Sequence, residues 1–279
     1  MKVFTIARLT FLEARRRWLF WAVILIGLVC LALYATGFYF AYRDFSRYAR
    51  NEVRQVLEPT NFFLLAGLYV VNFLTVVLAV LTSVDTIAGE IGSGTIHTIV
   101  TKPLQRWEVA LGKWVGFAIM LSGFAIIMSA GILAIVWFIA HYVPSNPIQG
   151  IALIVLGGLV MLTLSILGST RLSTLTNGVV VFMLYGVAFI AGWIEQFGAF
   201  FHNATAVDIG IVVSLLIPSE AMWKRAAYLM QPPFLRELGL GVTPFGSASA
   251  PSEVMVGYTI GYVIVLLICA LYSFQKRDL

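Results

Sequence analysis

The sequence contains little charge, little histidine and little cysteine. Only 11% of its 279 residues are charged while 60% are hydrophobic, and the mean hydropathy is +0.94. A water-soluble domain usually carries about 25% charged residues, which keep its surface hydrated. The composition therefore excludes a soluble globular domain and predicts an integral membrane protein.

The scarcity of ligand-forming side chains limits the chemistry that the chain can perform. His97, His141 and His202 all avoid the middle of an apolar run, which argues against haem held by paired intramembrane histidines. No H-E-x-x-H motif is present, and no pair of carboxylates is expected at membrane depth for proton relay or proteolysis. Cys30 and Cys269 fall inside apolar runs, where thiols act as small hydrophobic groups. We therefore expect no enzymatic role, no metal and no cofactor bound by this chain.

Six apolar runs are long enough to cross a bilayer, which takes about 20 residues for each helix. A seventh run, 206–218, is too short to cross and is predicted to be re-entrant or interfacial. The residues after it, 219–231, are predicted to form a helix that ends before two prolines. The predicted fold is an all-α integral membrane protein with six transmembrane helices, at residues 19–42, 62–84, 114–139, 150–168, 178–197 and 254–274.

Lysine and arginine favour one side of this predicted bundle. If the N-terminus is cytoplasmic, the inner segments hold eleven of these residues and the outer segments hold seven. The cluster at residues 15–17 directly precedes the first span, where orientation is usually set. We expect a multi-pass protein of the cell's inner (plasma) membrane with both termini cytoplasmic. Residues 198–253 would then form a long extracytoplasmic loop.

The segment before the first span, residues 1–18, has an amphipathic pattern. Phe4, Ala7, Phe11 and Ala14 recur at spacings of three and four, and arginines occupy other faces. This pattern predicts a helix lying on the inner membrane surface. The alternative is a simple extension of the first span.

Glycines at helix-packing spacing occur in two of the apolar runs. They are Gly112 with Gly116, and Gly257 with Gly261. The G-x-x-x-G pattern lets two helix backbones approach closely in lipid. Packing within one subunit is favoured over a seam between two subunits.

One polar segment, residues 85–113, interrupts the apolar sequence between the second and third spans. Gly92 and Gly94 permit a sharp turn, residues 95–101 make about two helical turns, and Pro103 ends that short helix. A new helix is predicted to begin near Gln105. Because two turns are not stable alone in water, the short helix must dock on another surface. The spacing leaves open whether this surface belongs to the chain itself, to lipid headgroups or to a cytoplasmic partner.

The same segment carries a family resemblance. Its residues Glu90, Ser93-Gly94-Thr95, Pro103, Arg106, Glu108 and Gly112-Lys113 resemble the pattern E, S-G-T, P-x-x-R-x-E and G-K of type-2 ABC exporter permeases (ABC-2 transporter transmembrane subunits). The final residues FQKRDL are similar to the cytoplasmic tails of that family, and the first helix is similar to its elbow helix. Within the family, the sequence is most similar to the copper-enzyme-maturation (NosY-like) and sodium-export (NatB-like) branch.

The resemblance implies a mechanism and a set of partners. In that family the loop after the second span contains a coupling helix, which sits in a groove on a separate ATP-hydrolysing subunit. This sequence has no G-x-x-x-x-G-K-[ST] phosphate loop, so ATP and Mg²⁺ are expected on that partner. The implied assembly has two ATPase subunits and two permease subunits, as a homodimer or a heterodimer, and exports an unidentified substrate. The residues assigned to ATPase coupling are Glu90, Gly94, Thr95, Pro103, Arg106 and Lys113, with the charges at the polar rim of the contact.

Further polar residues occur along the first two spans. Tyr69, Asn72 and Thr75 form a stripe that would line a transport path or face a second subunit, although hydrogen bonding between helices is a sufficient explanation. A helix continuing beyond the first span would present one basic stripe of Arg43, Arg47, Arg50 and Arg54. This stripe would meet anionic substrate, headgroups or an extracytoplasmic partner, or else form a solvated, salt-bridged face.

Two carboxylates lie near the predicted outer interface. Glu195 and Asp208 are taken as solvated or helix-end charges.

Two other functions compete with that of an exporter subunit. The first is a non-transporting membrane anchor that passes ATPase motion to an extracytoplasmic partner protein through residues 198–253. Loss of that partner's function without measurable cargo flux would favour the anchor. The second, an intramembrane enzyme or electron-transfer subunit, is disfavoured by the missing ligands and carboxylate pairs. Nothing in the sequence predicts binding to nucleic acid.

Overall fold

The computed structural model describes residues 2–16, 18–48, 53–86, 88–89, 105–234, 245 and 251–276. Within these ranges the secondary structure is helical, with no strand. The predicted all-α class is therefore confirmed. The helices are α1 (Lys2–Arg16), α2 (Trp18–Tyr48), α3 (Val53–Ser83), α6 (Arg106–Ala140), α7 (Pro147–Ser169), α8 (Thr174–Phe200), α9 (Ala204–Leu216), α10 (Ser219–Met230) and α12 (Glu253–Gln275).

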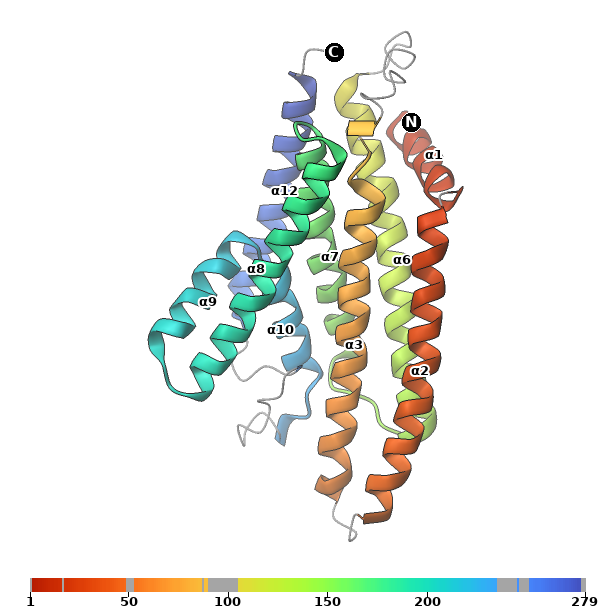
Figure 1. Ribbon diagram of the computed structural model, residues 1–279, viewed down its shortest axis with the longest axis vertical. Helices are drawn as coiled ribbons and strands as arrows, with labels where there is room; N and C mark the ends of the chain where they lie inside the picture. Colours follow the sequence, from red (N-terminus) through yellow and green to blue (C-terminus); the bar gives the residue numbers. More distant parts are fainter. Residues whose placement is uncertain are drawn as a thin grey trace.

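Six of these helices are long and apolar enough to span a membrane, as predicted from the sequence. They are α2, α3, α6, α7, α8 and α12, and they pack side by side along the long axis of the molecule (Figure 1). The start of α1 and the end of α12 lie at the same end of the bundle (Figure 1), which agrees with an even number of crossings. We refer to this as the terminal end of the bundle and to the other as the opposite end.

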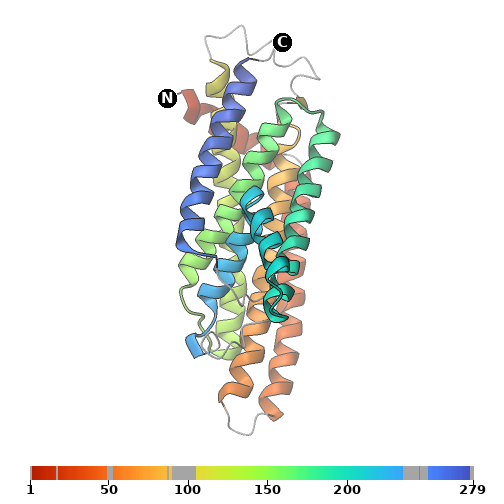
Figure 2. The ribbon, with the colours of Figure 1, turned by 90° about the vertical axis from the view of Figure 1, so that its left-hand side faces the viewer.

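The apolar stretches of α3 and α7 are the most deeply buried of the six spanning helices. The ribbon places α7 (green) between α12 (blue) and α3 (orange) (Figure 2). The helix α7 contacts α3, α6, α8, α10 and α12. The helices α2 and α12 lie at the periphery and leave most of their apolar surface exposed. In a bilayer that surface faces lipid or another protein.

The hairpin of α2 and α3 extends further than the predicted spans. Each helix has 31 residues, or about 46 Å at 1.5 Å for each residue, against a hydrocarbon core of about 30 Å. The extension at the opposite end is held by a cluster of aromatic rings in tilted, edge-to-face and stacked contacts, formed by Phe38, Tyr42, Phe45 and Phe63. Most of the segment between the first two predicted spans is therefore helical.

The helices α9 and α10 form a bent pair, with an angle of 112° between them. The first lies along α8, and the second returns toward the end of the bundle from which the pair started (Figure 1). The short apolar run at 206–218 thus does not cross by itself, as its length predicted. Most residues of α10 are buried, and glycines of α7 allow the close approach: Gly150 lies against Met230, and Gly157 lies against Met222.

Two tyrosines of α12 hold the bend between α9 and α10. The hydroxyl of Tyr258 donates to the carbonyl of Leu215 at 2.6 Å, and that of Tyr262 donates to the carbonyl of Leu216 at 2.7 Å. The last carbonyls of a helix have no partner within it, so these two bonds complete the end of α9.

Threonine hydroxyls inside the spans are mostly satisfied within their own helix. Those of Thr75, Thr82 and Thr259 each donate to the carbonyl four residues earlier, at 2.7 Å. This local bond removes the cost of burying a hydroxyl in apolar surroundings. These hydroxyls therefore do not depend on a neighbouring helix.

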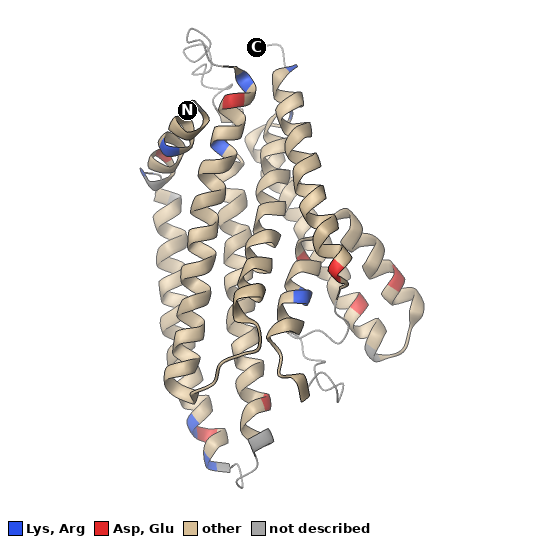
Figure 3. Ribbon diagram, turned by 180° about the vertical axis from the view of Figure 1, so that it is seen from behind, with Lys and Arg blue, Asp and Glu red and all other residues tan. Residues whose placement is uncertain are grey.

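Charged residues gather at the two ends of the bundle and leave most of its middle uncharged (Figure 3). The exceptions lie on α8, α9, α10 and the start of α12, where acidic and basic residues occur part-way along the molecule (Figure 3). Charge at membrane depth is costly and usually functional.

Candidate functional site

The terminal end of the bundle holds the described part of the segment at residues 85–113. Four of the residues assigned to coupling, Glu90, Gly94, Thr95 and Pro103, lie outside the described residues. The other two, Arg106 and Lys113, belong to the first turns of α6. The predicted helix start near Gln105 is confirmed: the backbone N–H of Gln105 donates to the Glu108 carboxylate at 3.0 Å in a capping box.

Lys113 has a different environment from the one that the sequence suggested. Its side chain is buried, with 7% exposure, and its ammonium donates to the backbone carbonyl of Thr86 at 2.9 Å. This bond joins α6 to the turn that follows α3, 27 residues earlier. A buried lysine cannot serve as a rim charge for a partner. Its hydrogen bond instead connects Thr86, where the segment between the spans begins, to α6, where that segment ends.

The turn after α3 is also tied to α8. The hydroxyl of Thr174 donates to the Asp85 carboxylate at 2.7 Å. The amide of Asn177 donates to the carbonyl of Ser165 at 2.8 Å and reaches the carbonyl of Val84 at 3.4 Å. Four helices, α3, α6, α7 and α8, therefore meet at residues 84–86.

The helix α1 packs on the same turns of α6 through the first of the two predicted glycine pairs. A Cβ atom at Gly112 would lie 2.7 Å from Cβ of Ile6, and one at Gly116 would lie 2.8 Å from the carbonyl oxygen of Ala7. Only glycine permits this approach. The expectation of packing within one subunit is confirmed for this pair. A Cβ atom at Gly257 or Gly261 would meet nothing within 4 Å.

The comparison with family models decides the membership of the chain. Residues 4–279 match the model described as an ABC-2 family transporter protein. This chain belongs to the ABC-2 transporter family. It is therefore a membrane-spanning permease subunit of a family that normally works with an ABC ATPase and is not itself catalytic. None of the curated proteins matches it significantly.

The structure buries the predicted polar stripe of this ABC-2 subunit. Asn72 and Thr75 have 2% and 0% exposure, and the ring of Tyr69 lies 5.0 Å from that of Trp223 on α10. The methyl group of Thr75 lies against Gly158 of α7. The three residues thus belong to the packing of α3 on α7 and α10. A role in a transport path or at a subunit interface stays a prediction.

The predicted basic stripe is described only in part. Arg43 and Arg47 are exposed on one face of α2, near the opposite end of the bundle. Arg50 lies outside the described residues, and Arg54 is in α3, with a side chain that the structure does not describe. The stripe therefore stays a prediction for these last two residues.

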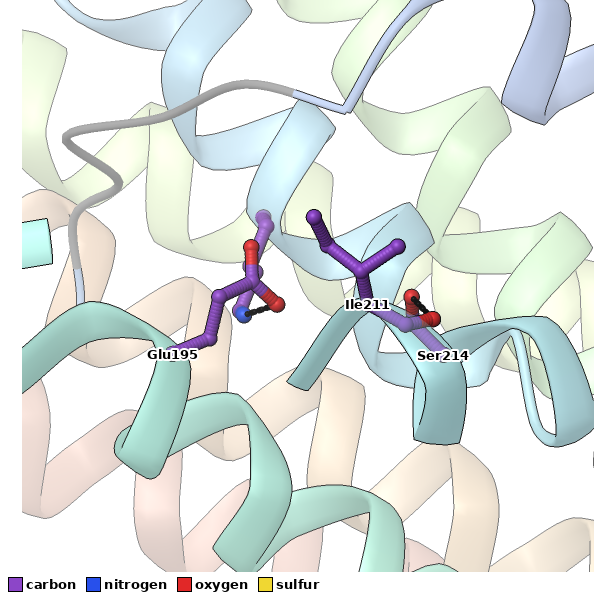
Figure 4. A network of polar contacts seen from close by, with 4 residues as sticks. Glu195, Ile211 and Ser214 are labelled. Carbon is purple, nitrogen blue, oxygen red and sulfur yellow. Dashed lines mark hydrogen bonds and ion pairs between the residues drawn. The ribbon is translucent and has the colours of Figure 1, made fainter. Parts of the chain in front are cut away.

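The interpretation of Glu195 as a solvated charge is wrong. Its carboxylate is buried on α8, with 8% exposure, and accepts a hydrogen bond from the ammonium of Lys224 on α10 at 2.7 Å (Figure 4). Glu220, one turn before Lys224, is buried beside it. Glu195 and Glu220 are thus both buried where α8 meets α10, a grouping of carboxylates that the sequence did not predict. Asp208, by contrast, is exposed, as expected.

We call Glu195, Glu220 and Lys224 the buried charge cluster. The sequence signal for it was a Glu and a Lys four residues apart, in a helix of small and apolar residues after a run too short to span. Two carboxylates are too few for a typical protein metal site. Among the residues that the structure describes, no three His, Cys, Asp or Glu side chains are grouped to hold a metal ion.

Proposed function

We propose that this chain is the transmembrane permease subunit of an ATP-driven exporter. It would couple ATP hydrolysis on a separate ABC ATPase, which holds ATP and Mg²⁺, to export of a substrate across the plasma membrane. Two permease subunits and two ATPase subunits would form the assembly, with the termini and the terminal end of the bundle in the cytoplasm. The supporting observations are the family match over residues 4–279 and the bond from Lys113 to Thr86.

The bond from Lys113 to Thr86 joins two points of the bundle that are also connected by residues 87–104 of the chain. These residues connect Thr86 to the start of α6 in the sequence, so a push on them acts on both points. Because the Lys113 ammonium joins those two points, α3 and α6 would move together rather than separately. The contacts of Asp85 and Asn177 would carry the same displacement to α8. A rigid-body response of this kind is one way in which ATPase motion is transmitted.

Two sets of variants separate the contact with the ATPase from the transmission of motion. The double variant Glu90→Ala with Arg106→Ala removes charges of the proposed contact, and Lys113→Met removes the internal bond. Tagged chains would be purified in mild detergent and tested for a co-purifying ATP-hydrolysing subunit. The matched control is Lys276→Met, because Lys276 is exposed at the end of α12 and over the ring of Tyr272.

We expect the double variant to lose the ATPase subunit. Lys113→Met should retain it, but a nucleotide-dependent change in distance between spin labels at Val70 on α3 and Ile119 on α6 should appear, whereas the parent chain should show none because its two helices move together. Both labelled positions are exposed, so labelling should leave the packing intact. Failure of any ATPase to accompany the parent chain in several detergents would contradict the proposal. Cargo flux in vesicles then separates an exporter from a membrane anchor acting on an extracytoplasmic partner.

A further inference from the structure

A partly open cavity of about 420 Å³ lies between α8, α9, α10 and α12. Most of its wall is apolar, including Ile211, Leu215, Val254 and Met255. The charged residue that lines it is Glu195, and Ser214 stands across from it on α9 (Figure 4). The cavity therefore offers hydrocarbon contact and one acidic group.

The glycines around this cavity allow charge to be buried there. A Cβ atom at Gly192 of α8 would lie 2.9 Å from Cγ of Glu220 and 3.4 Å from Cε of Lys224. A Cβ atom at Gly210 of α9 would lie 2.3 Å from Cβ of Glu195. Close helix approach at these two glycines thus encloses the buried charge cluster from α8 and α9.

The cluster contains one more acid than base. Lys224 binds Glu195, whereas Oε2 of Glu220, a residue with 6% exposure, has no hydrogen-bond partner in the part of the chain that the structure describes. The next basic residue, Arg225, has other partners. It donates a hydrogen bond to the carbonyl of Pro251, which lines the cavity, and forms an ion pair of 3.1 Å with Glu253. A buried carboxylate without a counter-charge costs several kcal/mol. A cation beside the cluster would remove this cost.

We propose that this cavity binds a lipophilic organic cation, with its hydrocarbon part against α9 and α12 and its positive charge beside Glu195. The apolar wall supplies contact area. Glu195, the carboxylate of the cluster on the cavity wall, supplies the preference for positive charge, because the cluster as a whole holds one more acid than base. Neutral and anionic compounds of equal size would gain the apolar contact but not the attraction to the carboxylate. Binding of such a cation does not depend on an ATPase partner.

The test measures binding of tetraphenylphosphonium to the purified chain, without ATPase, by scintillation proximity. Tetraphenylborate is the matched probe, because it has nearly the same shape and the opposite charge. We expect saturable binding of the cation and at least tenfold weaker binding of the anion. Phosphatidylethanolamine, added as a competitor, distinguishes a lipid amine from a free organic cation as the natural occupant.

Three variants and one control connect binding to the cluster. Glu195→Gln and Glu220→Gln each remove the surplus charge, so each should weaken binding of the cation at least tenfold. Ile211→Trp fills the cavity and should abolish binding without altering charge. Asp208→Asn is the control, because this carboxylate is exposed on α9, and it should change the affinity less than twofold.

Thermal unfolding of each variant shows whether it is folded, and Ile211→Trp keeps the proposal testable if a carboxylate variant does not fold. Equal binding of the two tetraphenyl probes would overturn the proposal. So would unchanged cation binding in folded Glu195→Gln and Glu220→Gln. In either case a proton, rather than an organic cation, neutralises the surplus carboxylate.

Discussion

The packing of α1 on α6 makes a quantitative prediction for Gly116→Ala. The new Cβ atom would lie 2.8 Å from the backbone oxygen of Ala7 and 3.0 Å from Cβ of Thr10, whereas ordinary contact begins at 3.4 Å. A backbone oxygen cannot rotate away, so α1 must move by about 0.6 Å or lose contact with α6. Overpacking of this kind costs about 1–3 kcal/mol. This is a change of between about fivefold and more than a hundredfold in the folding equilibrium.

The assay is reversible unfolding in mixed micelles with increasing dodecyl sulfate, compared with Gly123→Ala. Gly123 lies on the same helix, and a Cβ atom there would meet nothing within 4 Å. We expect Gly123→Ala to change the free energy of unfolding by less than about 0.5 kcal/mol. Equal stability of the two variants would refute the reasoning, because α1 would then not be held against α6 at Gly116.

Two further predictions use the same unfolding assay. Thr163→Val should cost about 1–3 kcal/mol because the Trp114 indole, which donates to the Thr163 hydroxyl at 2.9 Å, would lose its partner. Thr259→Val, which removes a hydroxyl bonded within its own helix, should cost less, and the reverse order would contradict the assignment. Lys224→Met should cost about 3–5 kcal/mol because Glu195 would stay buried without a counter-charge. Adding Glu195→Gln should restore most of that loss, and a purely additive double variant would show that the pair does not interact.

The spans could be predicted from the sequence because few backbone structures are stable in lipid. A run of about 20 apolar residues has to satisfy its backbone within a helix, so length and composition determine its structure. The glycine spacing at Gly112 and Gly116 was informative for the same reason, since close backbone approach requires small side chains. Both signals are local, and both were confirmed.

The polar contacts could not be predicted because they depend on which helices become neighbours. Lys113 was expected at a partner's rim, but the position of Thr86 beside α6 gives it a carbonyl within its own chain. Glu195 was expected in solvent because its counter-charge is 29 residues away, on a short helix that returns into the bundle. A sequence pattern reports spacing along the chain and not the side of a helix that a later segment covers.

The threonine hydroxyls that bond within their own helix affect how the spans can move. A hydroxyl satisfied by the carbonyl four residues earlier has no bond to break when the neighbouring helix shifts along it. Shear at these three positions then meets resistance mainly from side-chain packing, and small sliding steps there expose no polar group. A helix bundle of this kind is suited to alternate between two arrangements of the same secondary structure.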